Sequence, residues 1–165
     1  MKRKKFIPYR RKREGKTDYK KRLRLLKSGA LRLVVRKSLR NITVQIIQYD
    51  KNGDKTLLSS TSAELQEYGW KGYGRNLPAG YLVGLLCGMK AKQKKIDYVI
   101  FDQGLYPARK GTVIYGVLKG FTDAGVNVPH DSSIFPEEER LMGKHISDEI
   151  TKQFDAVKTK IQQVK

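Results

Sequence analysis

LRLVVRKSLRNITVQIIQYDKNGDKTLLSST, residues 31–61, carries the strongest structural signal in this chain. Apolar and polar residues alternate along it with the period of two that is typical of β-strands. Asn52 and Gly53 favour a tight hairpin turn, because both residues readily adopt positive φ. The stretch therefore predicts an antiparallel meander of three strands, at about 31–36, 42–49 and 55–61.

The first of these strands carries two arginines on one side. Side chains alternate between the faces of a strand, so Arg32, Val34 and Arg36 share one face and Leu33 and Val35 share the other. We expect the Leu33 side to pack on the core. The opposite side would then present both arginines to a partner.

Downstream of the meander, strand and helix signals alternate. Asn76 followed by Pro78 is typical of a helix start and predicts a helix over about 77–93. The run 96–102, IDYVIFD, has the continuous apolar character of a buried parallel strand. A second helix over 111–124 and a short strand over 126–128 would follow. The pattern predicts an α/β fold: a mixed sheet of about five strands, antiparallel meander then helix-strand-helix-strand, with helices on its faces.

The chain divides into three parts by composition. Residues 1–16 show no apolar periodicity and are expected to form a basic, extended, disordered N-terminal arm. Residues 17–136 form the expected α/β domain, which opens with a short helix over 18–28 capped by Thr17 or Asp18. Residues 137–165 form a C-terminal helical tail, in which 147–163 carry a single apolar stripe.

Positive charge is concentrated at the start of the chain. The formal net charge is +19, and 14 of residues 1–27 are Lys or Arg against two acids. Nucleic acid, an anionic membrane and an acidic protein are the candidate partners. Phe6, Tyr9 and Tyr19 lie among the cations, which suits RNA, since rings stack on unpaired bases while guanidinium groups pair with phosphates. A membrane-surface helix would need a wider apolar face than Leu23 and Leu26 provide.

The sequence argues against a secreted or membrane-integral protein. Cys87 is the only cysteine, which leaves no internal disulfide and favours a reducing compartment. No apolar run follows the basic start as it would in a signal peptide, and the longest apolar-rich run, 81–89, is too short to cross a bilayer. We expect a cytoplasmic protein with no membrane partner.

The glycine-rich stretch GWKGYGRNLPAG, residues 69–80, is a second candidate for RNA binding. Lys71 and Arg75 supply charge, Trp70 and Tyr73 could stack on bases, and the glycines allow close approach of the backbone to a phosphate. The letters KGYG match the opening of an RNA-recognition motif, but RNLP lacks its strand aromatics, so that fold is rejected. A plain flexible loop is the alternative. The Gly-Lys-Ser/Thr ending of a nucleotide-hydrolysing P-loop is missing, so that function is not supported.

Acidic residues give only a weak signal for catalysis. Asp102 follows a buried strand, where α/β proteins often place active groups. A metal-dependent nuclease would need further carboxylates converging on it, and Asp97, Asp123 and Asp131 have no spacing that predicts this. We therefore expect no catalytic residue, no metal site, no cofactor and no small-molecule substrate. Cys87 lies in an apolar run and is interpreted as a core thiol.

Several motifs in succession resemble one family. RLVVRKSLRNITVQII with TLLSSTS, then NLPAGYLVGLLCGMKAK, then VIFDQGLYPARKGTVIYGVLKGFTDAGVNVPH and FPEEERLMGKHI, are similar in order to ribosomal protein L-eighteen of the large subunit. LKGFTDAGVNVPH and RLMGKHI resemble its archaeal and eukaryotic branch. The long eukaryotic extension is lacking, so the resemblance is to the archaeal form, over roughly 5–147.

This resemblance implies a function and a fold. The function is to bind 5S rRNA and help attach it to the large rRNA in the central protuberance, beside neighbouring ribosomal proteins and without enzymatic activity. The fold would be a ribonuclease-H-like arrangement without catalytic carboxylates. The residues expected to face RNA, from their chemistry and by matching position, are Lys2, Arg3, Lys4, Lys5, Tyr9, Arg10, Arg11, Lys12, Arg13, Lys16, Lys20, Lys21, Arg32, Arg36, Arg40, Trp70, Lys71, Tyr73, Arg75, Arg109 and Lys110.

Two rival functions remain open at this point. The first is a metal-dependent nuclease that uses Asp102. The second is a non-ribosomal nucleic-acid-binding protein or chaperone acting mainly through the basic arm, which would bind unrelated DNA or RNA equally well. An acidic protein partner is a weaker third possibility, because aromatic residues are interleaved with the basic ones.

Overall fold

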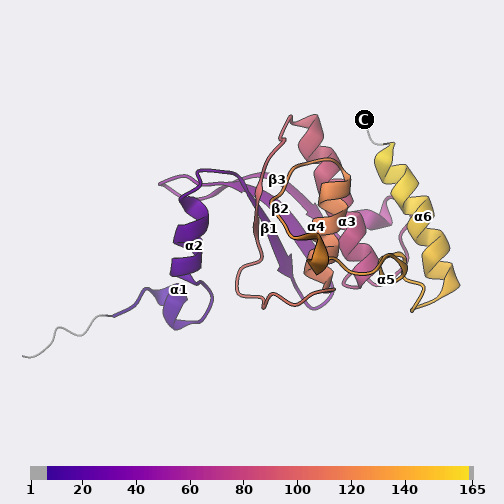
Figure 1. Ribbon diagram of the computed structural model, residues 1–165, viewed down its shortest axis with the longest axis horizontal. Coiled ribbons are helices and arrows are strands. Elements are labelled where there is room, and N and C mark those ends of the chain that lie inside the picture. The colour runs from indigo at the N-terminus through magenta and orange to yellow at the C-terminus, as the bar shows by residue number, and fades with distance from the viewer. Residues whose placement is uncertain (1–6, 164–165) are drawn as a thin grey trace, which may run out of the picture.

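The computed structural model describes residues 7–163 (Figure 1). Two short helices come first, followed by three strands, an alternating helix-strand-helix run and two final helices. The elements are α1 (Arg10–Arg13), α2 (Tyr19–Leu26), β1 (Arg32–Lys37), β2 (Ile42–Gln48), β3 (Lys55–Thr61), the 3-10 turn η1 (Glu64–Gln66), α3 (Leu77–Gln93), β4 (Ile100–Asp102), α4 (Val113–Asp123), η2 (Ser132–Ile134), α5 (Glu138–Met142) and α6 (Asp148–Gln162).

The sheet confirms the predicted meander. Its strand order is β3-β2-β1-β4, with β1–β2 and β2–β3 antiparallel and β4 parallel to β1. Arg32 on β1 is opposite Ile47 on β2 and Ile100 on β4, so β1 lies inside the sheet. The β2–β3 turn passes through Gly53 at φ 140°, a conformation that glycine adopts without steric cost.

The prediction of about five strands is wrong for the part of the chain that the structure describes, which has four. Residues 126–128 make only an isolated parallel bridge, between Asn127 and Tyr98. Two hydrogen bonds hold it, from Val99 N to Asn127 O (3.1 Å) and from Asn127 N to Asp97 O (2.9 Å). Pro129 follows directly, and it has no backbone N–H with which to extend the ladder.

Helices lie on both sides of the sheet (Figure 1). Helices α3 and α4 cover one face, α6 packs on the far side of α3, and α2 lies over the opposite face. Helix α3 is buried almost throughout, which explains why its sequence is apolar all round. Its start is as predicted: the Asn76 side chain accepts from Ala79 N at 2.9 Å. Among residues 7–163, no helix has the length and apolar character needed to span a bilayer.

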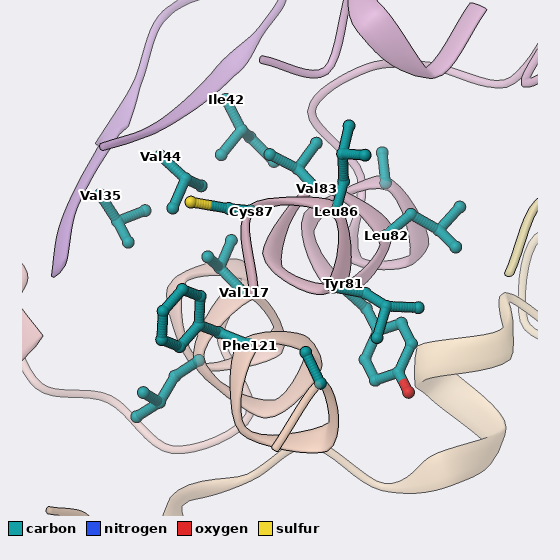
Figure 2. Close-up of a cluster of buried hydrophobic side chains, with 14 of the residues drawn as sticks. Val35, Ile42, Val44, Tyr81, Leu82, Val83, Leu86, Cys87, Val117 and Phe121 are labelled. Atoms are coloured by element: carbon teal, nitrogen blue, oxygen red, sulfur yellow. The ribbon is translucent and has the colours of Figure 1, made fainter. Parts of the chain in front are cut away.

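The core lies between the sheet, α3 and α4 (Figure 2). Val35 and Val44 from the strands face Cys87 of α3, and Phe121 of α4 closes the cluster from below in this view. All four side chains are fully buried. The prediction that Cys87 is a core thiol is therefore confirmed.

Burial of Cys87 gives a direct test of this packing. Removal from water disfavours the thiolate and raises the pKa of Cys87 to about 12. Since the thiolate is the reactive form, we expect Cys87 in the native protein to resist iodoacetamide at pH 8 and to be alkylated promptly in guanidinium chloride. Mass spectrometry measures the fraction of the protein that carries the carbamidomethyl group. Equal alkylation rates in the native and denatured states would contradict the packing.

The N-terminal arm differs from the prediction where the structure describes it. Residues 10–13 form the short helix α1, so the expected extended conformation is wrong there. The carbonyl of Tyr9 accepts from Lys12 N and Arg13 N, and Arg10 Nε pairs with Glu14 at 2.7 Å, one turn further on. The predictions for Lys2, Arg3, Lys4 and Lys5 lie outside the described residues.

The C-terminal tail is helical, as predicted. Ser147 caps α6 by accepting from Ile150 N, and Phe154, Val157 and Ile161 form a buried stripe. This stripe packs toward α3, where Phe154 and Tyr81 have ring centroids 5.4 Å apart. The tail therefore docks on its own domain.

Candidate nucleic-acid interface

A cavity of about 500 Å³ lies between α2, the segment before it and the outer face of the sheet. We call it the α2 cavity. Its lining is partly apolar and includes Leu25 of α2 with Val34 and Ile47 of the sheet. Six cations line it, five of them from the predicted RNA-facing set and the sixth Arg22: Arg11, Lys16, Lys21, Arg22, Arg32 and Arg36.

Helix α2 begins at a strong cap. The carboxylate of Asp18 accepts hydrogen bonds from Lys20 N at 2.9 Å and Lys21 N at 3.1 Å. The backbone N–H of Lys21, followed by that of Lys20, stabilises the charged form and lowers the pKa of Asp18 below its ordinary value. The structure thus selects Asp18 from the two predicted caps, and the cap fixes where α2 starts.

The cations of α2 point in two directions. Lys21 Nζ donates to the carbonyl of Gly104 at 2.9 Å, and Arg22 Nη2 donates to Asp54 at 2.8 Å, so these two side chains tie the helix to the domain. The remaining cations, Lys20, Arg24 and Lys27, are exposed. The helix therefore presents one basic face to solvent.

Arg32 lies under this helix rather than on an open surface. Only 2% of the residue is exposed, and its guanidinium donates to Asp102 at 2.9 Å and to Asp54 at 2.6 Å. The expectation that this face of β1 is open is wrong at Arg32, because α2 covers it. Arg36, nearer the strand end, is exposed and donates to the carbonyls of Val35 and Asp102. Within residues 7–163, it forms no ion pair with a carboxylate.

Three of the four carboxylates considered for catalysis have structural roles. Asp102 accepts from Arg32 through one oxygen and from Gly104 N through the other, at 2.9 Å each. Asp123 accepts from Tyr81 and Lys119, while Asp131 caps the η2 turn. Among residues 7–163, no three acidic, histidine or cysteine side chains gather as a metal site would require.

A second basic cluster forms where the β1–β2 turn meets the glycine-rich loop. A hollow of about 590 Å³ lies there, and Arg40, Lys71 and Tyr73 are among its lining residues. The hydroxyl of Tyr73 donates to the carbonyl of Leu39 at 2.6 Å, which holds loop and turn together. The Tyr73 residue remains 56% exposed, and both cations are exposed. The structure thus brings together residues that the sequence analysis selected separately, with Arg75 partly buried nearby.

Trp70, expected to stack on RNA, lies instead in the core. It is 3% exposed, so no base reaches it while the loop keeps this conformation. Helix α6 holds the loop: Lys160 Nζ donates to the Tyr68 carbonyl at 3.2 Å, and Lys71 N donates to the Gln153 side chain at 3.3 Å. The alternative of a plain flexible loop does not describe this anchored segment.

Arg109 and Lys110 are exposed on the loop between β4 and α4. Tyr106 ties the same loop to the end of β1, since its hydroxyl bonds both the N–H and the carbonyl of Lys37 at 3.1 Å. Arg109 and Lys110 therefore lie on an anchored loop, separate from the residues that line the two hollows.

The ion pair that connects α2 to the hairpin, Arg22 with Asp54, was not predicted from the sequence. Asp54 lies beside the turn at Gly53, where an acid is common, so nothing in its sequence context distinguished it. Arg22 belongs to a run of cations, and the sequence gives no residue in that run a distinct role. The one available signal was helical spacing, which puts Arg22 on the side of α2 away from Lys20 and Arg24.

The Arg22–Asp54 pair predicts a pH dependence of stability. The hydrogen bond from Arg22, and then that from Arg32, lowers the pKa of Asp54 against the opposing effect of burial. A carboxyl whose pKa is lower in the folded state stabilises that state above its unfolded pKa of about 3.9, and this stabilisation is lost as pH falls through the folded pKa. We therefore expect Asp54→Asn to have a lower Tm than the unsubstituted protein at pH 7, with the gap narrowing by pH 3.

Thermal unfolding by circular dichroism across pH 3–7 measures this gap. Asp155→Asn, at an exposed position of α6, is the matched control and should show no such narrowing. A gap for Asp54→Asn that stays constant down to pH 3 would contradict the proposed charge interaction.

Known proteins resemble this chain over the regions just described. The model of a family described as "Ribosomal large subunit proteins 60S L5, and 50S L18" matches residues 3–98. One relative, "Large ribosomal subunit protein uL18" of Methanococcus maripaludis, is 51% identical over 142 residues, which cover 86% of this chain and 74% of that protein. The family match includes α2, the meander and the glycine-rich loop.

Proposed function

Since this chain belongs to the family of large-subunit ribosomal proteins that includes uL18, in its archaeal form, we propose that it binds 5S rRNA and helps attach it to the large rRNA in the central protuberance. Membership makes the chain a structural constituent of the large ribosomal subunit, located in the cytoplasm with rRNA as partner, and not an enzyme. The nuclease and the non-ribosomal alternatives are thereby set aside.

The observation that carries the proposal is the docked helix α2. Its exposed cations, Lys20, Arg24 and Lys27, are held at set positions on an ordered domain. A folded RNA presents phosphates at equally set positions, so such a surface can favour one RNA shape over another. A free basic arm cannot discriminate in this way, because it adapts to any polyanion.

We assign the other contacts by chemistry. In this proposal the basic arm, Lys16, Lys20, Arg36, Arg40, Lys71 and Arg75 contact phosphates, and Tyr9 and Tyr73 stack on unpaired bases. Lys21, which was also expected to face RNA, holds α2 on the domain instead. Arg109 and Lys110 reach the RNA from their own loop. Arg32 and Trp70 hold the surface in place from beneath, since both are buried. Proteins of the central protuberance are the proposed neighbours.

We also infer that the fold is the ribonuclease-H-like arrangement implied by the family resemblance. An antiparallel meander extended by one parallel strand, with α3 and α4 on one face, supports this inference. In this arrangement Asp102 supplies a structural ion pair to Arg32 rather than a metal ligand.

Competition binding tests the proposed function. At roughly 150 mM salt, we expect the full chain to bind 5S rRNA in preference to a generic RNA duplex of equal length. A variant with Arg10, Arg11, Lys12 and Arg13 all changed to Gln should bind both RNAs more weakly and keep the preference. Equal affinity of the full chain for both RNAs would contradict the proposal.

A further inference from the structure

Asp54 lies between two arginines from different elements. It immediately precedes β3, and its carboxylate accepts from Arg22 of α2 at 2.8 Å and from Arg32 of β1 at 2.6 Å. Arg32 in turn pairs with the buried Asp102 of β4 at 2.9 Å. A continuous chain of ion pairs therefore runs from helix α2 into the middle of the sheet.

Helix α2 depends on such polar bonds for its position. It has only eight residues, and a helix of that length is not stable alone in water. None of its residues is fully buried, and Leu23 is 58% exposed, so apolar packing holds it weakly. Within residues 7–163, two side-chain hydrogen bonds join α2 to the sheet and its loops: that from Arg22 to Asp54 and that from Lys21 to the Gly104 carbonyl.

We propose that Asp54 is a positioning residue for rRNA binding: by holding Arg22, it fixes α2 so that Lys20, Arg24 and Lys27 meet the phosphates together. This inference rests on the function proposed above. The Asp54 side chain is 25% exposed and already shared by two guanidinium groups, so it repels RNA little and contacts none itself.

Electrostatics alone predicts the opposite change in affinity for RNA when Asp54 is substituted. Removing a carboxylate from a basic surface makes that surface more positive, which strengthens binding to a polyanion. Positioning predicts weaker binding, because a released α2 must be ordered again when RNA binds, at a cost in conformational entropy. The direction of the change in affinity therefore decides between the two.

The test compares Asp54→Asn with Asp50→Asn in the full chain. Asp50 lies on the same hairpin and pairs with the exposed Lys55 at 2.9 Å, so its substitution changes the charge identically without touching α2. We expect Asp54→Asn to weaken 5S rRNA binding about tenfold, equal to about 1.4 kcal/mol, and Asp50→Asn to leave it unchanged or slightly tighter. Circular dichroism establishes that both variants are folded.

A double-mutant cycle with Arg22→Gln separates positioning from a direct contact. Once Arg22 is removed, Asp54→Asn has no tie to α2 left to break. It still removes the pair with Arg32, but that pair lies within the sheet, so affinity should change little. Hydrogen exchange on the free protein gives a readout without RNA: the backbone amides of residues 22–26 should exchange faster in Asp54→Asn and at the ordinary rate in Asp50→Asn.

Four outcomes are decisive. Binding of Asp54→Asn as tight as that of the unsubstituted chain, or tighter, overturns the positioning role. Full additivity in the cycle with Arg22→Gln overturns it as well. If the unsubstituted chain shows no preference for 5S rRNA, the proposed function fails instead, and unchanged exchange in α2 would then overturn the positioning role on its own.

Discussion

Gly120→Ala is expected to destabilise the protein by at least about 3 kcal/mol, enough to unfold much of a marginally stable domain. A Cβ atom at Gly120 of α4 would lie 2.0 Å from the backbone carbonyl oxygen of Tyr81 in α3. The reciprocal approach is as close, since a Cβ at Gly84 would lie 2.1 Å from the carbonyl oxygen of Val117. Because backbone meets backbone, the two helices must separate to admit a methyl group.

Gly116→Ala in the same helix is the matched control. There the new Cβ would meet a terminal methyl of Leu77 at 2.7 Å, which is the end of a flexible side chain. Alanine also has the higher helix propensity, by about 1 kcal/mol, so the net change should be small. Urea denaturation measures both variants. Similar midpoints for Gly116→Ala and Gly120→Ala would contradict the close packing of α3 against α4.

Binding to 5S rRNA is expected to fall by about 10³- to 10⁵-fold between 50 and 200 mM salt, if six to ten phosphates are neutralised. The chain has the cations for this, with a net charge of +19 and an exposed basic face on α2. Each cation that meets a phosphate releases condensed counterions, and added salt opposes that release. Titrations at four salt concentrations give the slope of log affinity against log salt.

A variant of α1 measures how much of the salt dependence of binding comes from the arm and how much from the folded domain. With Arg10, Arg11, Lys12 and Arg13 changed to Gln, the slope should become shallower by about one for each phosphate that the variant no longer neutralises. Circular dichroism and a thermal melt provide the folding control. An unchanged slope would mean that α1 meets no phosphate and that the binding comes from elsewhere.

The sheet could be predicted well from the sequence, because its signals are local. Alternation and the pair Asn52 and Gly53 suffice to define a meander, and the structure has it. The predicted fifth strand does not form, and the cause is visible in the sequence: Pro129 ends the ladder after a single bridge at Asn127. The helix in the N-terminal arm was not predicted, because the run of like charges suggested only repulsion. The structure shows that Arg10 pairs with Glu14 one turn further on.

The sequence predicted which residue types make up the candidate site, but not how those residues are arranged. Alternation placed Arg32 on the correct face of β1, but only the docking of α2 shows that this face is covered. Trp70 was misplaced for the same reason, because α6 comes from the far end of the chain to hold the glycine-rich loop. Such long-range docking depends on tertiary contacts that no local pattern encodes.

Lysine acetylation of the protein, free and bound to 5S rRNA, would show whether the folded domain itself binds the RNA. Mass spectrometry reports the reactivity of each lysine. We expect RNA to protect Lys20, Lys27 and Lys71, which are exposed on the proposed surface, and to leave Lys92 and Lys95 at the end of α3 as reactive as before. Protection confined to residues 2–16, with α2 and the glycine-rich loop fully reactive, would contradict an RNA-binding surface on the folded domain.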